Sequence, residues 1–373
     1  MKNLSLLIKP ASGTCNLRCH YCFYLDELEN RKSGNFNFMD ENTTSNMITL
    51  ALASATDSIS FAFQGGEPTL AGLEYFERFV DYVHLRNTKK IPIHYSIQTN
   101  GTTIDRDWCR FLARNNFMVG ISLDGLELTH DRYRVYPDGK GSHSRVMETI
   151  SLLKRYKIDF NILCVVNSEN VKHPEEMFDT FMKNDLRYLQ FIECLDPLGV
   201  PKNSSPFSLD PAEYGKFLVA IFDKYYQEMM SGRYVFIRYF ENLMMIENDI
   251  RNELCTYKTG CAKNYVVEAN GNVYPCDFYC LDELVLGNVN TGTFKEFDHK
   301  RKELKFIERS REINEECLEC QYLKYCGGGC YRNIEQANGR LLKNHFCESY
   351  RYFLDNRLDQ LREVLEYWQE RQR

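Results

Sequence analysis

The sequence predicts an α/β protein built on a partial (β/α)6 barrel and followed by a cysteine-rich C-terminal region. Short apolar runs alternate with longer amphipathic runs through the first 240 residues, which is the pattern of a parallel sheet with helical crossovers. Six candidate strands are too few for an eight-unit barrel, so we expect the barrel to be incomplete. The cysteines are unevenly placed, since nine of the fifteen follow residue 250.

The expected elements follow from these runs in chain order. The strands are short, apolar and rich in β-branched or aromatic residues, at 4–9, 58–64, 91–99, 118–123, 160–166 and 188–192. The helices have apolar residues at helical spacing, at 40–53, 73–86, 105–115, 144–156 and 174–184. An Asn-Gly pair predicts a hairpin over 265–274, and residues 347–373 have the pattern of a closing helix.

Length and composition limit the classes of function. The chain has 373 residues, 43% hydrophobic and 26% charged, as in a soluble globular protein. We expect two domains, 1–240 and 241–373, joined by a polar stretch near 246–253. The apolar run 4–8 is too short for a signal peptide or membrane span, so a cytoplasmic location is expected. A net charge of -6 disfavours nucleic acid as a partner.

Three cysteines in one short segment constrain the chemistry most. Cys15, Cys19 and Cys22 have the spacing C-x3-C-x2-C. A [4Fe-4S] cluster usually has four thiolate ligands, so three on one loop leave one iron open to a substrate or cofactor. A structural zinc site is the alternative. Zinc loops usually pair two C-x2-C knuckles, whereas the next cysteine after Cys22 is the distant Cys109.

This motif, with an aromatic residue before its last cysteine, resembles the signature of the radical S-adenosylmethionine (SAM) enzymes. In that family the open iron binds SAM, which is cleaved to a 5'-deoxyadenosyl radical. Further motifs follow the second, third, fourth and sixth expected strands, where barrel active sites lie. The resemblance implies SAM contacts from Tyr21, Gly66, Glu67, Ser122, Arg134 and Leu195. A solvated surface charge remains the alternative for Arg134, and a plain core residue for Leu195.

The C-terminal cysteines resemble the SPASM domain, which carries two auxiliary [4Fe-4S] clusters. The resemblance implies one set of four ligands in Cys255, Cys261, Cys276 and Cys330, and a second in Cys317, Cys320, Cys326 and Cys347. Two zinc sites would satisfy the same count. The four cysteines outside these motifs are expected to be inert core residues, with Cys280 in question because it lies close to Cys276: Cys109, Cys164, Cys194 and Cys280.

Asp277 is the candidate general base, because a cluster bond at Cys276 would hold its carboxylate in place. A helix cap or a solvated turn is the alternative. The segments Phe61 to Gly72 and Tyr274 to Tyr279 resemble the anaerobic sulfatase-maturating enzymes of the clostridial type. That resemblance implies oxidation of a sulfatase cysteine or serine to Cα-formylglycine, with three [4Fe-4S] clusters and SAM as cofactors.

The same resemblance implies the partners. The substrate is an unfolded or nascent sulfatase segment with a Cys/Ser-x-Pro-x-Arg motif, and the electron donor is of the flavodoxin or ferredoxin type. A SPASM-type peptide maturase that forms thioether or other crosslinks is the alternative function. Many of those carry a leader-binding domain, and the fourteen residues before Cys15 leave no room for one. A non-catalytic zinc or electron-transfer module is the rival from another class.

Overall fold

The computed structural model describes residues 1–250, 253–337 and 340–371. The chain divides into two compact units, each made of segments that are far apart in sequence. Unit 1 contains Met1–Leu123, Asp131–Phe160 and Lys263–Lys305. Unit 2 contains Asp124–His130, Asn161–Ala262 and Phe306–Arg373.

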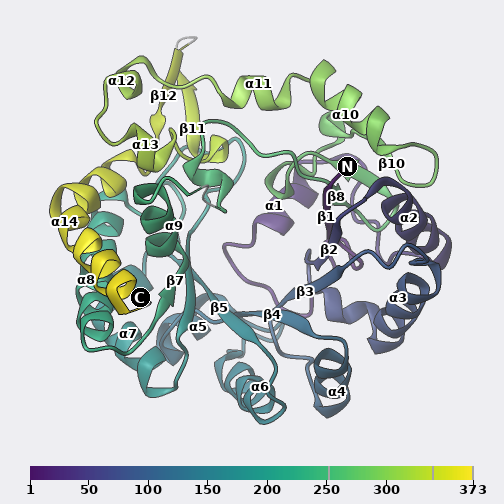
Figure 1. Ribbon diagram of the computed structural model, residues 1–373, viewed down its shortest axis with the longest axis horizontal. Coiled ribbons are helices and arrows are strands. Elements are labelled where there is room, and N and C mark those ends of the chain that lie inside the picture. Colours follow the sequence, from purple (N-terminus) through teal and green to yellow (C-terminus); the bar gives the residue numbers. More distant parts are fainter. Residues whose placement is uncertain (251–252, 338–339, 372–373) are drawn as a thin grey trace. The chain divides into compact units, whose positions relative to one another are not determined.

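The sheet of unit 1 has the strand order β10-β9-β8-β1-β2-β3-β4 (Figure 1). Strands β1 to β4 are parallel neighbours. Their bounds are β1 (Asn3–Ile8), β2 (Ser58–Phe63), β3 (Ile93–Thr99) and β4 (Phe117–Ser122). The helices that accompany them are α1 (Phe23–Glu29), α2 (Glu41–Ser54), α3 (Leu73–Arg86), α4 (Arg106–Arg114), α5 (Glu127–Tyr133, which ends in this unit) and α6 (His143–Arg155).

Strand β2 shows how the sequence pattern determines the packing. Its residues alternate between buried and half-buried positions, and Phe61 and Phe63 are 0% and 1% exposed. Both rings pack edge to face against Phe79 of α3, with ring centroids 5.1 and 4.9 Å apart. The alternate positions of β2 carry only small side chains, Ser60 and Ala62. The bulky face therefore binds the helix layer, whereas the opposite face is lined by small residues.

The predicted hairpin is confirmed and joins the same sheet. Strands β8 (Val266–Val267) and β9 (Asn272–Tyr274) are antiparallel, and β10 (Gly287–Asn288) continues the sheet. Gly271 supplies the positive φ angle of the turn, at 85°. Strand β8 pairs in parallel with β1, Leu7 lying opposite Val266. This pairing brings residues near 270 beside the start of the chain.

Unit 2 has a parallel sheet in the order β5-β6-β7 and a separate hairpin. Helix α14 runs alongside α8 (Figure 1), and Ser349 of α14 donates a hydrogen bond to the Pro211 carbonyl at 2.6 Å. The strands are β5 (Phe160–Val166), β6 (Tyr188–Glu193), β7 (Phe236–Ile237), β11 (Ile334–Ala337) and β12 (Arg340–Asn344). The helices are α7 (Pro174–Lys183), α8 (Pro211–Met230), α9 (Arg238–Glu247), α11 (Phe306–Ser310), α12 (Glu315–Leu318), α13 (Leu323–Cys326) and α14 (Cys347–Arg371).

Glu247 joins three helices of unit 2. Its carboxylate pairs with Lys324 of α13 at 2.8 Å and with Arg362 of α14 at 2.8 Å, and it also accepts a hydrogen bond from Tyr325. Burial opposes ionisation, but these donors outweigh it and lower the pKa of Glu247 to about 2. The ionised carboxylate thus holds in place the short helix that ends at Cys326.

The six predicted strands and five predicted helices are confirmed, with ends within two residues of those observed. The closing helix is also confirmed as α14, and helix α10 (Phe294–Glu303) lies in unit 1. Within the expected polar stretch 246–253, helix α9 ends at Glu247, and residues 251–252 lie outside the described part of the chain. None of the helices in the described residues is both long and apolar enough to cross a lipid bilayer.

Candidate functional site

The loop that carries Cys15, Cys19 and Cys22 follows β1, and backbone hydrogen bonds hold it on two sides. On one side the N–H groups of Gly66 and Glu67 donate to the carbonyls of Ser12 and Thr14, both at 2.8 Å. On the other side, Arg18 and His20 donate to the carbonyls of Val135 and Tyr133 at 2.7 and 3.1 Å. The loop is therefore positioned by two segments that come from other parts of unit 1.

Gly66 is required for this close packing. A Cβ atom placed on Gly66 would lie 2.2 Å from the Thr14 carbonyl oxygen, which is far inside van der Waals contact. Because the obstructing atoms belong to the backbone, no side-chain movement could relieve the clash. A role for Gly66 in binding SAM stays a prediction, and its role in seating the cysteine loop is an additional one.

The surroundings of Cys15 suit a cluster-bound thiolate. Its Sγ accepts hydrogen bonds from the Leu17 N–H at 3.3 Å and from Asn100 Nδ2 at 3.7 Å. Burial and the nearby charge of Glu67 raise the pKa of the Cys15 thiol to about 11, so a metal ion would have to displace the proton. Burial also raises the pKa of Cys22. The donors at Cys15, on a loop that also carries Cys19 and Cys22, fit the three-thiolate side of a [4Fe-4S] cluster.

In the described residues, no three Cys, His, Asp or Glu side chains are already grouped around one point as a single metal ion would require. The ligand sets are therefore assigned from spacing and resemblance and stay predictions.

Glu67 links the loop after β2 to the loop after β3 through hydrogen bonds to its carboxylate. It is fully buried. One carboxylate oxygen accepts from the Thr69 N–H at 3.1 Å and the Thr99 hydroxyl at 2.7 Å, and the other accepts from the Asn100 N–H at 2.7 Å. The carboxylate thus ties the loop after β2 to the loop after β3, whose Asn100 side chain reaches Cys15.

Tyr21 and Arg134 lie together beside the cysteine loop. Each is 8% exposed, and the Arg134 guanidinium carbon is 5.4 Å from the centroid of the Tyr21 ring. Arg134 is therefore not a solvated surface charge. Ser122, at the end of β4, is half-buried and accepts a hydrogen bond from Gln98 at 3.2 Å. Leu195 lies in unit 2 just after β6 and is half-buried, so it is not a plain core residue.

Asp277 follows the β8–β9 hairpin and has a 13% exposed side chain. Its Oδ2 accepts hydrogen bonds from the Tyr24 hydroxyl at 2.8 Å and from Gln64 Nε2 at 3.2 Å. Its Oδ1 lies 3.4 Å from the Lys9 ammonium. Burial raises the pKa of Asp277, although the charge of Lys9 and the Tyr24 hydrogen bond oppose the rise. The carboxylate caps no helix and is not solvated, so neither alternative for it holds.

Lys9, Tyr24 and Gln64 were not predicted as site residues. Lys9 is 1% exposed, at the end of an apolar strand. A charge that ends a buried run is a local signal, because a buried cation needs partners. Its partners Glu27 and Glu268 lie at 3.0 and 3.6 Å. Tyr24 gives no such signal, because it reaches Asp277 across 253 residues.

Each of two C-terminal cysteines, Cys326 and Cys330, has other predicted cluster ligands as neighbours. Burial raises the pKa of Cys326 to about 11, and the neighbouring thiols that raise it further are those of Cys347, Cys317 and Cys320. Burial raises the pKa of Cys330 to about 12, with Cys255 and Cys261 as the thiol neighbours. These neighbours agree with seven of the eight predicted ligands, and the two ligand sets stay predictions. The fourth cysteine of the first set, Cys276, belongs to unit 1.

The four cysteines outside these sets are all buried, as expected for core residues: Cys109, Cys164, Cys194 and Cys280. Cys280 differs from the others because its Sγ lies 3.2 Å from the Lys9 ammonium.

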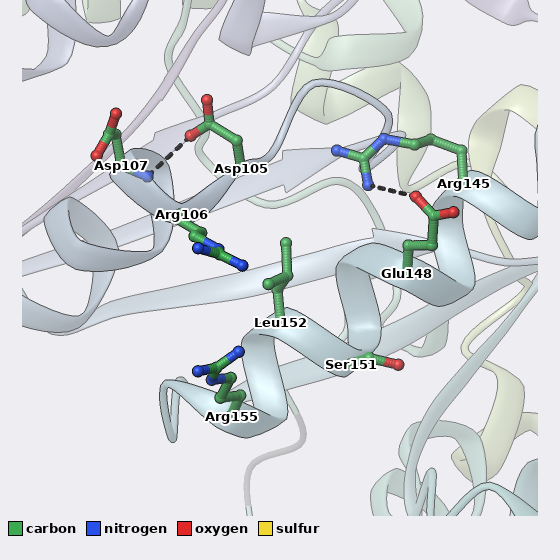
Figure 2. Close-up of a pocket in the computed structure, with 8 residues that line it drawn as sticks. All are labelled: Asp105, Arg106, Asp107, Arg145, Glu148, Ser151, Leu152 and Arg155. Carbon is green, nitrogen blue, oxygen red and sulfur yellow. Dashed lines mark hydrogen bonds and ion pairs between the residues drawn. The ribbon is translucent and has the colours of Figure 1, made fainter.

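A surface hollow of about 740 Å³ lies elsewhere in unit 1, between the start of α4 and helix α6 (Figure 2). Its lining is charged, and Arg145 pairs with Glu148 across 3.5 Å. No residue predicted for the site lines this hollow. This hollow therefore gives no reason to move the predicted site away from the cysteine loop and Asp277.

Comparison with known proteins identifies the family of this chain. The profile of the Radical SAM superfamily matches residues 10–181, and that of the SPASM iron-sulfur cluster-binding domain matches residues 255–321. A cysteine-type anaerobic sulfatase-maturating enzyme of Clostridium novyi is 43% identical over 97% of both chains. A serine-type enzyme of Bacteroides thetaiotaomicron is 30% identical over 94% of this chain and 89% of its own.

A solved structure agrees with these relatives. Native anSMEcpe with bound AdoMet and the Cp18Cys peptide has a TM-score of 0.93 and 40% identity, covering 98% of this chain and 99% of that one. The predicted fold, a partial (β/α)6 barrel with a SPASM domain, is thereby confirmed. With relatives this similar over almost its whole length, the chain belongs to the anaerobic sulfatase-maturating enzymes of the radical SAM superfamily.

Proposed function

We propose that this enzyme oxidises a cysteine of a sulfatase polypeptide to Cα-formylglycine. The observation that carries the proposal is Asp277, a mostly buried carboxylate anchored through Oδ2 by Tyr24 and Gln64 and adjacent in sequence to a predicted cluster ligand. Cysteine is the proposed substrate because the cysteine-type relative is 43% identical and the serine-type relative 30%.

Three [4Fe-4S] clusters and SAM are the proposed cofactors. Cys15, Cys19 and Cys22 would hold the cluster at which SAM binds, and the two C-terminal sets would hold the auxiliary clusters. The proposed SAM contacts are Tyr21, Gly66, Glu67, Ser122, Arg134 and Leu195. The proposed domain division is 1–240 for the barrel and 241–373 for the SPASM domain.

Bound SAM supplies the 5'-deoxyadenosyl radical that removes a hydrogen atom from the substrate Cβ. Asp277 takes the thiol proton, and one electron passes to an oxidised acceptor, so a thioaldehyde results. Water then hydrolyses the thioaldehyde, releasing hydrogen sulfide and leaving the aldehyde of formylglycine. A carboxylate whose pKa is raised by burial is a stronger base than one in water, which suits this task.

The finer details of the partners are also proposals. The substrate segment carries Cys/Ser-x-Pro-x-Arg and is bound as an extended chain, while the sulfatase is unfolded or nascent. The electron donor is a flavodoxin or ferredoxin, and the site of action is the cytoplasm. The crosslinking alternative finds no comparable support, because the two relatives described above, each at least 30% identical over almost the whole chain, are sulfatase-maturating enzymes.

Anaerobic incubation of the reconstituted enzyme with SAM, a reductant and matched Cys and Ser peptides tests the proposal. The expected product from the Cys peptide is an aldehyde that can be trapped as a hydrazone and located by mass spectrometry. A crosslinked peptide without aldehyde would instead support the maturase alternative. Formation of 5'-deoxyadenosine with neither product would show that the peptide is not a substrate.

A further inference from the structure

Asp277 belongs to a group of five charged side chains that lie close together in unit 1. Its members are three carboxylates, Glu27, Glu268 and Asp277, and two cations, Lys9 and Arg31. Arg31 pairs with Glu268 at 2.8 Å, whereas Lys9 lies among all three carboxylates. Burying a lysine charge is costly unless it is paired, so its position reflects these partners.

The two oxygens of Asp277 have different surroundings. Oδ2 accepts hydrogen bonds from Tyr24 and Gln64. Oδ1 accepts no hydrogen bond from the described residues, and Lys9 lies 3.4 Å from it. Oδ1 is itself buried, so it faces Lys9 and the buried charges rather than an open space, and Lys9 is the charged group that holds this side of the carboxylate.

Lys9 is itself held firmly. Its N–H donates to the Val267 carbonyl at 2.8 Å, so its backbone continues the pairing of β1 with β8. Its ammonium contacts Glu27 at 3.0 Å and lies 4.6 Å from the centroid of the Tyr24 ring. The ammonium therefore touches both Asp277 and Tyr24, the donor to the other Asp277 oxygen.

We infer that Lys9 is a positioning residue for the reaction: by holding Oδ1 from the buried side, it fixes the orientation of the Asp277 carboxylate relative to the substrate. This inference rests on the proposed function, because it assigns a role relative to Asp277 as base. Lys9 contacts neither substrate nor cofactor in this account and acts through Asp277. Misplacement of a reacting group by about 1 Å can cost roughly 100-fold in rate, so the expected effect is large.

A double variant that removes one positive and one negative charge separates the effect of Lys9 on the reaction from its effect on folding. Lys9→Met alone would leave buried carboxylates without their cation, and could fail to fold. Lys9→Met with Glu27→Gln, the balanced variant, removes one charge of each sign. Glu27→Gln alone is the matched control, since it keeps Lys9 beside Asp277. Burial raises the pKa of Glu27 to about 7, so glutamine resembles a form that this side chain readily takes.

The measurement is formylglycine formed per 5'-deoxyadenosine, with iron content and thermal unfolding as controls. We expect the control variant to keep the wild-type ratio and the balanced variant to lose roughly 10- to 100-fold, both with full iron. In an Asp277→Asn background the balanced change should cost nothing more, because its target is already gone. A residue with only a structural role would lower the ratio in both backgrounds.

An unchanged ratio in the balanced variant would overturn the inference while leaving the proposed function intact. Loss of iron in that variant, with iron kept in the control, would also overturn it, because Lys9 would then be structural. Failure of the proposed function would look different, since the unsubstituted enzyme would itself make no formylglycine.

Discussion

Replacing Glu67 by glutamine should destabilise the site through its hydrogen bonds, because each carboxylate oxygen faces a backbone N–H. The Thr69 N–H donates to one oxygen at 3.1 Å and the Asn100 N–H to the other at 2.7 Å. A glutamine has only one oxygen, so whichever way its amide is turned, its NH2 group faces a backbone donor. The Thr69 and Thr99 hydroxyls now donate to Glu67 at 2.6 and 2.7 Å, so either would have to turn to accept from the amide, and the Thr69 N–H would still lack an acceptor.

The magnitude follows from these contacts. A buried N–H without an acceptor costs about 1 to 3 kcal/mol, and the buried amide group that opposes it costs a similar amount. Glu67→Gln should therefore lower the free energy of unfolding by about 2 to 5 kcal/mol, measured by anaerobic urea unfolding. SAM binding should weaken as well, because the link from Glu67 through Asn100 to the cysteine loop is disturbed.

Glu74→Gln is the matched control, because it makes the same substitution on the following helix. The Glu74 side chain is 85% exposed, so its loss should change stability by less than about 0.5 kcal/mol. If Glu67→Gln unfolded at the same urea concentration as Glu74→Gln, Glu67 could not be the link between the two loops.

Three further predictions concern the metal sites and unit 2. Replacing Cys15, Cys19 and Cys22 together by alanine should abolish SAM cleavage while iron bound at the auxiliary sites remains, and zero iron would contradict the division of ligands. Cys320→Ala should lower iron content, activity and thermal stability together, because metal binding in a cysteine-rich region is coupled to its folding; unchanged values for all three would argue against its role. Glu247→Gln should cost up to about 3 kcal/mol in the free energy of unfolding above pH 4.5. Because the folded pKa of Glu247 is lowered to about 2, this difference from wild type should shrink as the pH falls toward that value, and a difference independent of pH would contradict the ion pairs.

The strands could be predicted because their signal is local. Phe61 and Phe63 alternate with small residues, and that alternation determines which face packs on a helix. The joining of β8 to β1 could not be predicted, since Leu7 and Val266 are brought together only by the tertiary fold. The sequence pattern of a two-residue strand contains nothing that specifies a partner so distant.

In the candidate site, too, contacts between residues that are distant in sequence could not be predicted. Asp277 could be proposed from its place beside Cys276 and from family resemblance, but its partners Tyr24 and Lys9 come from the other end of the chain. Arg134 was ambiguous for a related reason. Its burial depends on contact with Tyr21 rather than on its own neighbours in sequence.

The central claim is that Asp277 removes the substrate proton, and one measurement tests it directly. Asp277→Asn keeps the size of the side chain and an oxygen to accept hydrogen bonds from Tyr24 or Gln64, but it removes the base. The variant should still form 5'-deoxyadenosine, while formylglycine from the Cys peptide falls by roughly 10²- to 10⁴-fold. Serine should suffer at least as much, because a hydroxyl gives up its proton less readily than a thiol. Formylglycine made at the wild-type rate from both peptides would contradict the claim and leave Asp277 a structural residue.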